Sequence, residues 1–259
     1  MSLLEEILVS TRARVQESKQ KVSEAVLEDR VAAARPPRGL QHALSGPTTS
    51  IIAEIKRASP AKGDLNLTLN AGEMARKYAD GGAAAISVLT EPDFFKGSLE
   101  DLESVVGAVD LPVLRKDFIL DEFQILEARA AGADAVLLIE RAIGDDLGHM
   151  LRATRALSMD ALVEVFDEAD VELALAAGAT LVGVNHRDLE TFEVDPDRTK
   201  KLAALLPADV VVAGLSGVST RSDVEALEQA GAFAVLVGES LVTSSDPTAL
   251  LRSLSGKDE

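Results

Sequence analysis

The sequence predicts an α/β protein, a single (βα)8 TIM barrel with an N-terminal helical extension. A Gly-Ala step followed by an apolar run occurs four times, beginning at Gly82, Gly132, Gly178 and Gly231, at intervals of 46 to 53 residues. Four further short apolar runs lie before or between these segments, and the intervening stretches have helical periodicity. Strict alternation of strands and helices indicates a parallel sheet with right-handed crossovers, and eight such units in about 210 residues favour a closed barrel.

Residues 1–48 precede the repeat and are predicted to form the N-terminal helical extension, with the barrel catalytic domain over residues 49–259. Residues 3–34 have helical patterning with many charges, Pro36-Pro37 ends it, and residues 40–44 form another short helical turn. This segment is expected either to cover one end of the barrel or to form a solvated arm.

In the barrel, each Gly-Ala step indicates a glycine that ends a helix and leads into a buried strand. Asp167, Ser219 and Thr220 are candidate helix N-caps. An open doubly wound sheet is the alternative fold, but no Gly-rich dinucleotide turn follows any strand. The expected strands lie within residues 51–55, 82–88, 113–114, 132–138, 161–165, 178–184, 210–213 and 231–237, with clear helices over 122–131, 168–177 and 222–230.

Composition limits the classes of function. The formal net charge is −17, aromatic residues are 3% of the chain, and Trp and Cys are absent. The negative charge argues against nucleic acid and anionic membranes as partners, whereas a small anionic substrate needs only a local cluster of positive groups. The acidic N-terminus and the lack of an apolar run of roughly 18 residues favour a cytoplasmic protein.

Charged residues gather at the predicted carboxyl ends of the strands, where barrels keep their active sites. Alternation along each strand puts these side chains on the inner face. A structural ring of salt bridges is the alternative to acid–base chemistry, since buried charges need partners. The candidates are Glu54, Lys56, Lys116, Glu164 and Asn185, with Arg187 two residues further on.

A phosphate site is predicted at the last two strands, where glycine-containing turns let backbone N–H groups approach an anion. Ordinary turns and helix caps are the alternative. The three histidines have no ligand spacing, so no metal site is expected. The candidate phosphate-binding residues are Ser216, Gly217, Gly238, Glu239 and Ser240, with Ser59 and Lys62 from the long loop over residues 57–70.

Several motifs resemble those of the indole-3-glycerol-phosphate synthase family of tryptophan biosynthesis. The resemblance covers essentially the whole chain and is carried by Ile52–Gly63, Ser87–Glu91, Phe95–Ser98, Leu114–Phe118, Val163–Val165 and Gly183–Leu189. It implies a carbon–carbon lyase, a carboxy-lyase that converts 1-(2-carboxyphenylamino)-1-deoxyribulose 5-phosphate to indole-3-glycerol phosphate. It implies no cofactor and no metal, and other tryptophan-pathway enzymes are candidate partners.

The resemblance also implies roles for residues. Lys116 or Lys56 suits the acid at the ketone oxygen, Glu164 the base, and the second lysine the acid for dehydration. Lys56 can also pair with the substrate carboxylate. Glu54 and Asn185 match family residues that hold the lysines and sugar hydroxyls, Arg187 matches an arginine near the substrate, and Phe95 and Phe118 are candidates for an apolar wall.

One position departs from the family pattern. The family reads Ala-Glu-Ser-Gly after the seventh strand, and this chain reads Gly214-Leu215-Ser216-Gly217. Leucine accepts no hydrogen bond, and losing a positioned carboxylate slows a reaction by roughly 10–1000-fold. A slowed synthase is therefore expected. The alternatives are a paralogous phosphate-binding barrel acting on a related anthranilate-type or sugar-phosphate substrate, or a non-catalytic phosphate-binding scaffold.

Overall fold

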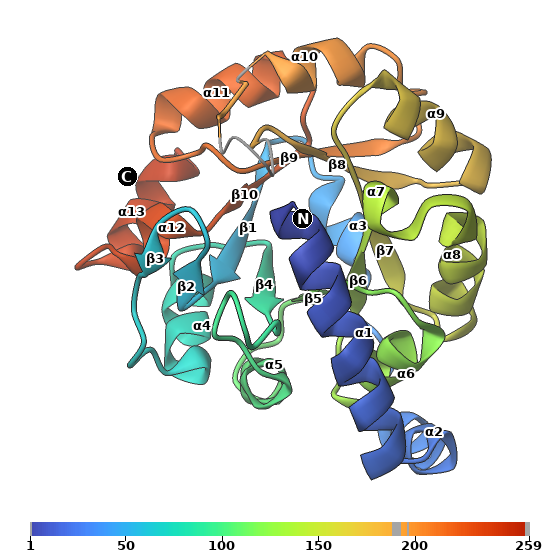
Figure 1. Cartoon of the computed structure of the whole chain (residues 1–259). Coiled ribbons are helices and arrows are strands. Elements are labelled where there is room, and N and C mark those ends of the chain that lie inside the picture. The colour runs from blue at the N-terminus through green and yellow to red at the C-terminus, as the bar shows by residue number, and fades with distance from the viewer. Residues whose placement is uncertain (1, 188–192, 196, 257–259) are drawn as a thin grey trace.

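The computed structural model describes residues 2–187, 193–195 and 197–256. Within them, eight parallel strands close into a barrel, in which each strand pairs with its neighbours in chain order and the last pairs with the first (Figure 1). The predicted TIM barrel is confirmed. The barrel strands are β1 (Ser50–Ile55), β4 (Ala85–Leu89), β5 (Val113–Lys116), β6 (Ala135–Ile139), β7 (Asp160–Val165), β8 (Leu181–Asn185), β9 (Val211–Leu215) and β10 (Ala234–Val237).

Helices cover the outside of the barrel and connect successive strands (Figure 1). They follow the sequence periodicity closely, since each of the expected segments 122–131, 168–177 and 222–230 overlaps a helix. The helices that follow the barrel strands are α4 (Ala71–Asp80), α5 (Leu99–Val106), α6 (Glu122–Ala130), α7 (Glu140–Ile143), the 3-10 helix η1 (Gly144–Asp146), α8 (Leu147–Ala156), α9 (Glu168–Ala177), α10 (Arg198–Ala203), α11 (Arg221–Gln229), α12 (Glu239–Val242) and α13 (Pro247–Leu254).

The four glycines of the repeat take the left-handed backbone that ends a helix. Gly82, Gly132, Gly178 and Gly231 have φ values of 87°, 91°, 87° and 96°. A side chain is disfavoured in this region, which explains why glycine stands at each of these turns. The repeat in the sequence is therefore the recurring turn from an outer helix into a barrel strand.

The sequence prediction misplaced several boundaries. β5 continues to Lys116 and β9 to Leu215, beyond the ends of the apolar runs at Leu114 and Ala213. Polar or small residues at a strand end do not interrupt the ladder when the neighbouring strand supplies the pairing. Thr220 caps α11, whereas Ser219 is not the cap but donates to Asp223.

The N-terminal extension is two long helices and a short one rather than one long helix. α1 (Leu3–Lys21) and α2 (Glu24–Ala33) are separated at Val22, and α3 (Leu40–Leu44) follows the Pro-Pro break. The extension covers both ends of the barrel: α1 lies across the carboxyl ends of the strands, and α3 packs under their amino ends, where Gln41 N donates to Asp160 of β7. The boundary at residue 48 stays a prediction.

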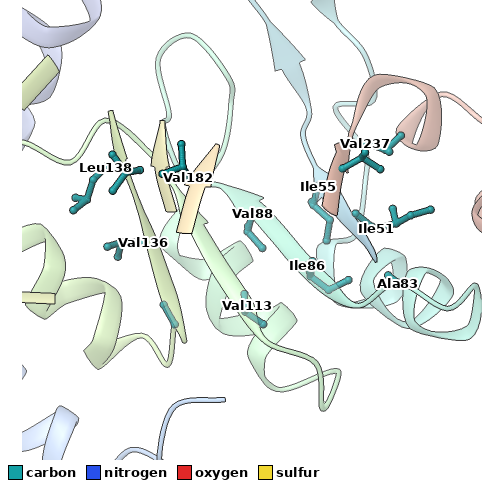
Figure 2. Packing of buried hydrophobic residues seen from close by; sticks show 14 of the residues in the cluster. Ile51, Ile55, Ala83, Ile86, Val88, Val113, Val136, Leu138, Val182 and Val237 are labelled. Atoms are coloured by element: carbon teal, nitrogen blue, oxygen red, sulfur yellow. The ribbon is translucent and has the colours of Figure 1, made fainter. Parts of the chain in front are cut away.

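The apolar core has two parts. The larger cluster lies between the strands and the outer helices, and Figure 2 shows Ile55, Val88 and Val237 among its side chains. The second cluster fills the barrel interior and includes Leu114, Leu162 and Leu236. The inward face of the strands thus ends in leucines below the mouth of the barrel, so the polar groups above them sit on an apolar floor.

Candidate active site

A cavity of about 410 Å³ opens at the carboxyl ends of the barrel strands. Its wall is built from the ends of the strands, the loop after β1 and the first turns of α1. Every candidate residue predicted from the sequence lines it: Glu54, Lys56, Lys116, Glu164, Asn185, Arg187, Ser59, Lys62, Phe95, Phe118, Ser216, Gly217, Gly238, Glu239 and Ser240.

The end of β1 and the residue that follows it supply a carboxylate and an ammonium that pair with each other. Lys56 Nζ donates to Glu54 Oε1 at 2.6 Å, and the Glu54 side chain is almost fully buried. A Cβ at Gly238 would lie 2.4 Å from Glu54 Oε1, so only glycine leaves room for this carboxylate. The pair places one positive and one negative group side by side within the cavity wall.

Glu164 of β7 is a second carboxylate with a different environment. Asn185 Nδ2 donates to its Oε1 at 3.1 Å, whereas Oε2 is buried and has no hydrogen-bond partner among the described residues. Burial raises the pKa of Glu164, and Glu54 adds to this, while Lys116 and the Asn185 hydrogen bond oppose it. A carboxylate with a raised pKa and an unused oxygen is suited to accept a proton.

Asn185 connects this carboxylate with the turn after β9. Its Oδ1 accepts hydrogen bonds from Ser216 Oγ and from the Arg187 backbone N–H, each at 3.0 Å. Its backbone oxygen accepts from Arg198 at 2.7 Å. The amide is thereby fixed in one orientation, with its nitrogen directed to Glu164 and its oxygen to Ser216.

The turn after β9 and the start of α12 lie next to each other at one side of the cavity. Ser216 and Gly217 have φ values of 73° and 78°, a sharp left-handed turn that is uncommon for serine. Ser240 Oγ donates to the Val218 backbone oxygen at 3.4 Å, and Lys62 pairs with Glu239 at 3.3 Å. The structure therefore brings the predicted phosphate-binding residues together, with the Glu239 side chain bonded to Lys62.

The opposite wall of the cavity is apolar. The rings of Phe95 and Phe118 lie with their centroids 6.3 Å apart, tilted by 38°. Leu3, Leu4 and Ile7 of α1 complete this wall, and none of the three is a predicted site residue. Their spacing marks the buried face of a helix, but spacing alone does not reveal at which end of the barrel that face packs.

Leu215 also lines the cavity, at the end of β9 and beside Asn185 of β8. Its side chain is 1% exposed and packs over Gly183, where a Cβ would lie 2.7 Å from Leu215 Cδ1. The floor between the acid–base groups and the Ser216 turn is therefore apolar at this point.

None of the three histidines lines the cavity, although His186 follows Asn185 and its Nδ1 lies 3.2 Å from the Ser216 backbone oxygen. His186 is buried, with Nε2 2.6 Å from Thr199 Oγ1, and burial lowers its pKa. His149 bonds to Glu122, and His42 is exposed. Residues 2–187, 193–195 and 197–256 contain no cluster of three or more His, Cys, Asp or Glu side chains that could hold a metal ion. Asp188 and Leu189 of the family motif lie outside the described residues.

The fold and the cavity define a barrel enzyme with acid–base groups at the carboxyl ends of its strands. A family model described as indole-3-glycerol phosphate synthase matches residues 4–254. The chain belongs to the indole-3-glycerol phosphate synthase family.

Its relatives in this family are similar over nearly their whole length. A protein named indole-3-glycerol phosphate synthase from Nocardioides sp. is 48% identical over 257 residues, which are 99% of each chain. One of the same name from Micrococcus luteus is 48% identical and covers 98% of this chain and 97% of its own. A third, from Mycobacterium avium, is 47% identical and covers 98% of this chain and 93% of its own.

Solved structures with the same fold are much more distant in sequence. 3-Hexulose-6-phosphate synthase superposes with a TM-score of 0.64 at 20% identity, over 81% of this chain and 99% of its own. Orotidine 5′-phosphate decarboxylase from Pyrococcus horikoshii gives 0.61 at 14% identity, over 80% and 98%. These likenesses support the barrel fold alone. In the described part of the chain, no helix is long and apolar enough to span a membrane.

Proposed function

We propose that the chain converts 1-(2-carboxyphenylamino)-1-deoxyribulose 5-phosphate to indole-3-glycerol phosphate, the activity that its relatives' names state. The observation that carries the proposal is the convergence of Lys56, Lys116 and Glu164 in one cavity, between an aromatic wall and the Ser216 turn. The cavity therefore offers a place for a ring, a reacting carbonyl and an anionic tail in the order in which this substrate presents them.

The first step is ring closure. The ring carbon that bears the carboxylate attacks the ketone carbon, and the ketone oxygen takes a proton from a lysine. Lys116 is the better placed donor, because its charge interacts with that of Glu164, whereas Lys56 is held by Glu54 at 2.6 Å. Protonation of the oxygen makes the carbonyl carbon electrophilic enough for an aromatic carbon to attack.

The second and third steps release CO2 and water. Loss of CO2 returns its bonding electrons to the ring. Glu164 then takes a proton from the adjacent carbon or nitrogen through its unbonded Oε2, and a lysine protonates the departing hydroxyl. Lys56 is close to the same cavity and is the candidate for this last transfer or for pairing with the substrate carboxylate.

The remaining candidates bind and orient. The phosphate is assigned to Ser216, Gly217, Gly238 and Ser240, with Lys62 exchanging Glu239 for the incoming anion. Asn185 is suited to bind a sugar hydroxyl, because its amide lies between Glu164 and Ser216. Arg187 also lines the cavity.

Leu215 lowers the expected rate. A substrate hydroxyl that passes over this side chain has no acceptor there, and a missing positioned polar group slows catalysis by roughly 10–1000-fold. The same apolar floor favours a second candidate function, in which the chain acts on a related anthranilate-type phosphate with fewer hydroxyl groups. Faster turnover of a substrate analogue that lacks one hydroxyl group of the sugar chain, compared with the full substrate, would support that alternative.

The test is a steady-state assay of indole-3-glycerol phosphate, followed by the fluorescence of the indole product. The purified chain is compared with Lys116→Ala and Glu164→Gln, each of which should lower kcat by about 100-fold or more while the circular dichroism spectrum is retained. The control variant is Lys21→Gln: Lys21 is exposed and pairs with Glu17 within α1, so kcat should not change. Absence of indole product with the wild-type chain, while the substrate still binds, would contradict the proposal.

A cytoplasmic location and association with other tryptophan-pathway enzymes complete the proposal. The family's biosynthetic role supports both, and the absence of cysteine fits the location. Fractionation of source cells and co-purification with the tagged chain test the two statements separately.

A further inference from the structure

The turn between β4 and α5 is organised around a buried carboxylate. Glu91 is 0% exposed, and its side chain accepts three backbone hydrogen bonds. Oε1 accepts from the Asp93 N–H at 3.1 Å, and Oε2 accepts from the N–H groups of Phe94 at 2.7 Å and Phe95 at 3.0 Å. A single buried side chain thus fixes three successive peptide groups.

The rest of the turn leaves no room for adjustment. The Gly97 N–H donates to the Glu91 backbone oxygen at 2.9 Å, and a Cβ at Gly97 would lie only 2.0 Å from the Leu89 oxygen. Lys96 has a φ of 57°, and its Nζ donates to the Asp93 oxygen at 2.8 Å. The backbone therefore has one way to pass from Glu91 to Gly97.

Phe95 is the residue of this turn that faces the cavity. Its ring lies against Phe118, and its backbone oxygen accepts from the Ala58 N–H at 3.2 Å, next to the loop that carries Ser59 and Lys62. Glu91 itself is not among the residues that line the cavity. Any effect of Glu91 on the substrate must therefore pass through the turn and through Phe95.

We propose that Glu91 is a positioning residue that holds the Phe95 ring in place as the wall for the substrate's aromatic ring. This inference rests on the proposed function. A carboxylate is required because the three N–H groups need two acceptor oxygens, whereas glutamine offers one oxygen and turns an amide donor toward a backbone donor. A shift of the ring by even one ångström would weaken its contact with the substrate.

The position of the wall can be measured directly, because the chain contains no tryptophan. In a Phe95→Trp background the new indole is the only one in the protein. Adding Glu91→Gln should shift its emission to longer wavelength and increase iodide quenching, since the ring leaves its contact with Phe118. Glu103→Gln, an equal charge change on the exposed face of α5, should alter neither signal.

Binding is measured with an analogue of the substrate in which the ketone is reduced to an alcohol, so that ring closure is impossible. Glu91→Gln should weaken its binding about tenfold, the loss expected for one hydrogen bond to a charged group. In a Phe95→Ala background the same substitution should have almost no effect, because the ring through which Glu91 acts is gone. Glu91→Asp, which keeps the charge, should recover part of the affinity.

The outcomes separate this inference from the proposed function. Additive losses from Glu91→Gln and Phe95→Ala, or an unchanged Phe95→Trp emission, would overturn the positioning role. If Glu91→Gln does not fold, the same cycle with Glu91→Asp decides the question. If the variants show the expected coupling in analogue binding but the wild-type chain forms no indole product, the proposed function is overturned and the positioning role stands.

Discussion

Glu164 keeps an ionisable carboxylate inside the barrel, with one oxygen bonded to Asn185 and the other without a partner among the described residues. Burial raises the pKa of this group, so the folded chain holds the proton more tightly than the unfolded chain does. As the pH rises from the unfolded value, about 4.3, through the raised folded value, the wild-type chain therefore loses stability.

Glu164→Gln removes this titration together with the base. The variant should lose catalysis but unfold at higher urea concentration than the wild type at pH 8, by about 1–2 kcal/mol of unfolding free energy. The difference should shrink as the pH falls toward 4, because the wild-type carboxyl is then protonated in both states. Urea titrations at several pH values measure it, and a constant difference across this range would show that Glu164 does not titrate as a buried group.

At Leu215 the expected effects have the opposite signs: introducing a carboxylate should raise activity and lower stability. Leu215→Glu should raise kcat about tenfold or more if the position can orient Asn185 or a substrate hydroxyl. It should also lower the unfolding free energy by about 2 kcal/mol, because an apolar contact over Gly183 is lost and a charge is buried. Leu215→Met, with similar volume and no acceptor, is the control: it should change neither kcat nor stability by much. Equal kcat for both variants would remove Leu215 as the cause of slow turnover.

Among the elements, α1 is the one whose role could not be inferred from its own residues. Its polar side chains attach it to the barrel rim: Arg14 Nη2 lies 3.0 Å from Asp117 Oδ1, and Lys19 Nζ lies 2.7 Å from Asp121. Asp117 also accepts from Thr90 at 2.7 Å and from Arg115 at 3.1 Å. Burial alone would raise the pKa of Asp117, but Arg115 and Arg14 lower it overall, so the carboxylate is ionised.

Arg14→Gln should loosen α1 from the strand end that carries Lys116. Because Leu3, Leu4 and Ile7 then close the cavity less often, KM should rise about tenfold, the equivalent of one lost hydrogen bond between charged groups, with a smaller change in kcat. Hydrogen exchange of the α1 amides should become faster. Lys21→Gln, which breaks an ion pair within α1 only, is the matched control. Faster exchange with an unchanged KM would mean that α1 protects the fold but does not bind substrate.

Some elements could be predicted from the sequence and others could not. The barrel strands and their glycine turns were predictable because each is specified locally, by an apolar run and by a backbone conformation that favours glycine. The inward position of Glu164 and Lys116 followed from alternation along a strand. Glu91, Asp117 and the apolar face of α1 were not predicted as parts of the site, because their roles depend on contacts between segments far apart in the chain. Such contacts leave no periodic signal.

The whole molecule depends on a contact of the same kind at the opposite end of the barrel. Asp134, just before β6, is 0% exposed and accepts Arg35 through Nη1 at 2.6 Å and Nη2 at 2.9 Å. It also accepts the backbone N–H of Arg38 at 2.6 Å and of Val113 at 2.8 Å. One carboxylate therefore joins the linker between α2 and α3 to the start of two barrel strands.

Asp134→Ala should destabilise the entire chain rather than the extension alone, since it orphans buried donors in both parts. Removing one partner of a buried ion pair costs about 3–5 kcal/mol, which lowers the thermal midpoint by about 10 °C for a chain of this size. Asp110→Ala provides the control, because Asp110 pairs with Arg38 from a fully exposed position, where water screens the pair, and its loss should change stability little. Calorimetry and urea unfolding of both variants measure the difference. If the two variants unfold together with the wild type, or if Asp134→Ala gives a separate early transition for α1 to α3, the extension is not joined to the barrel through this carboxylate.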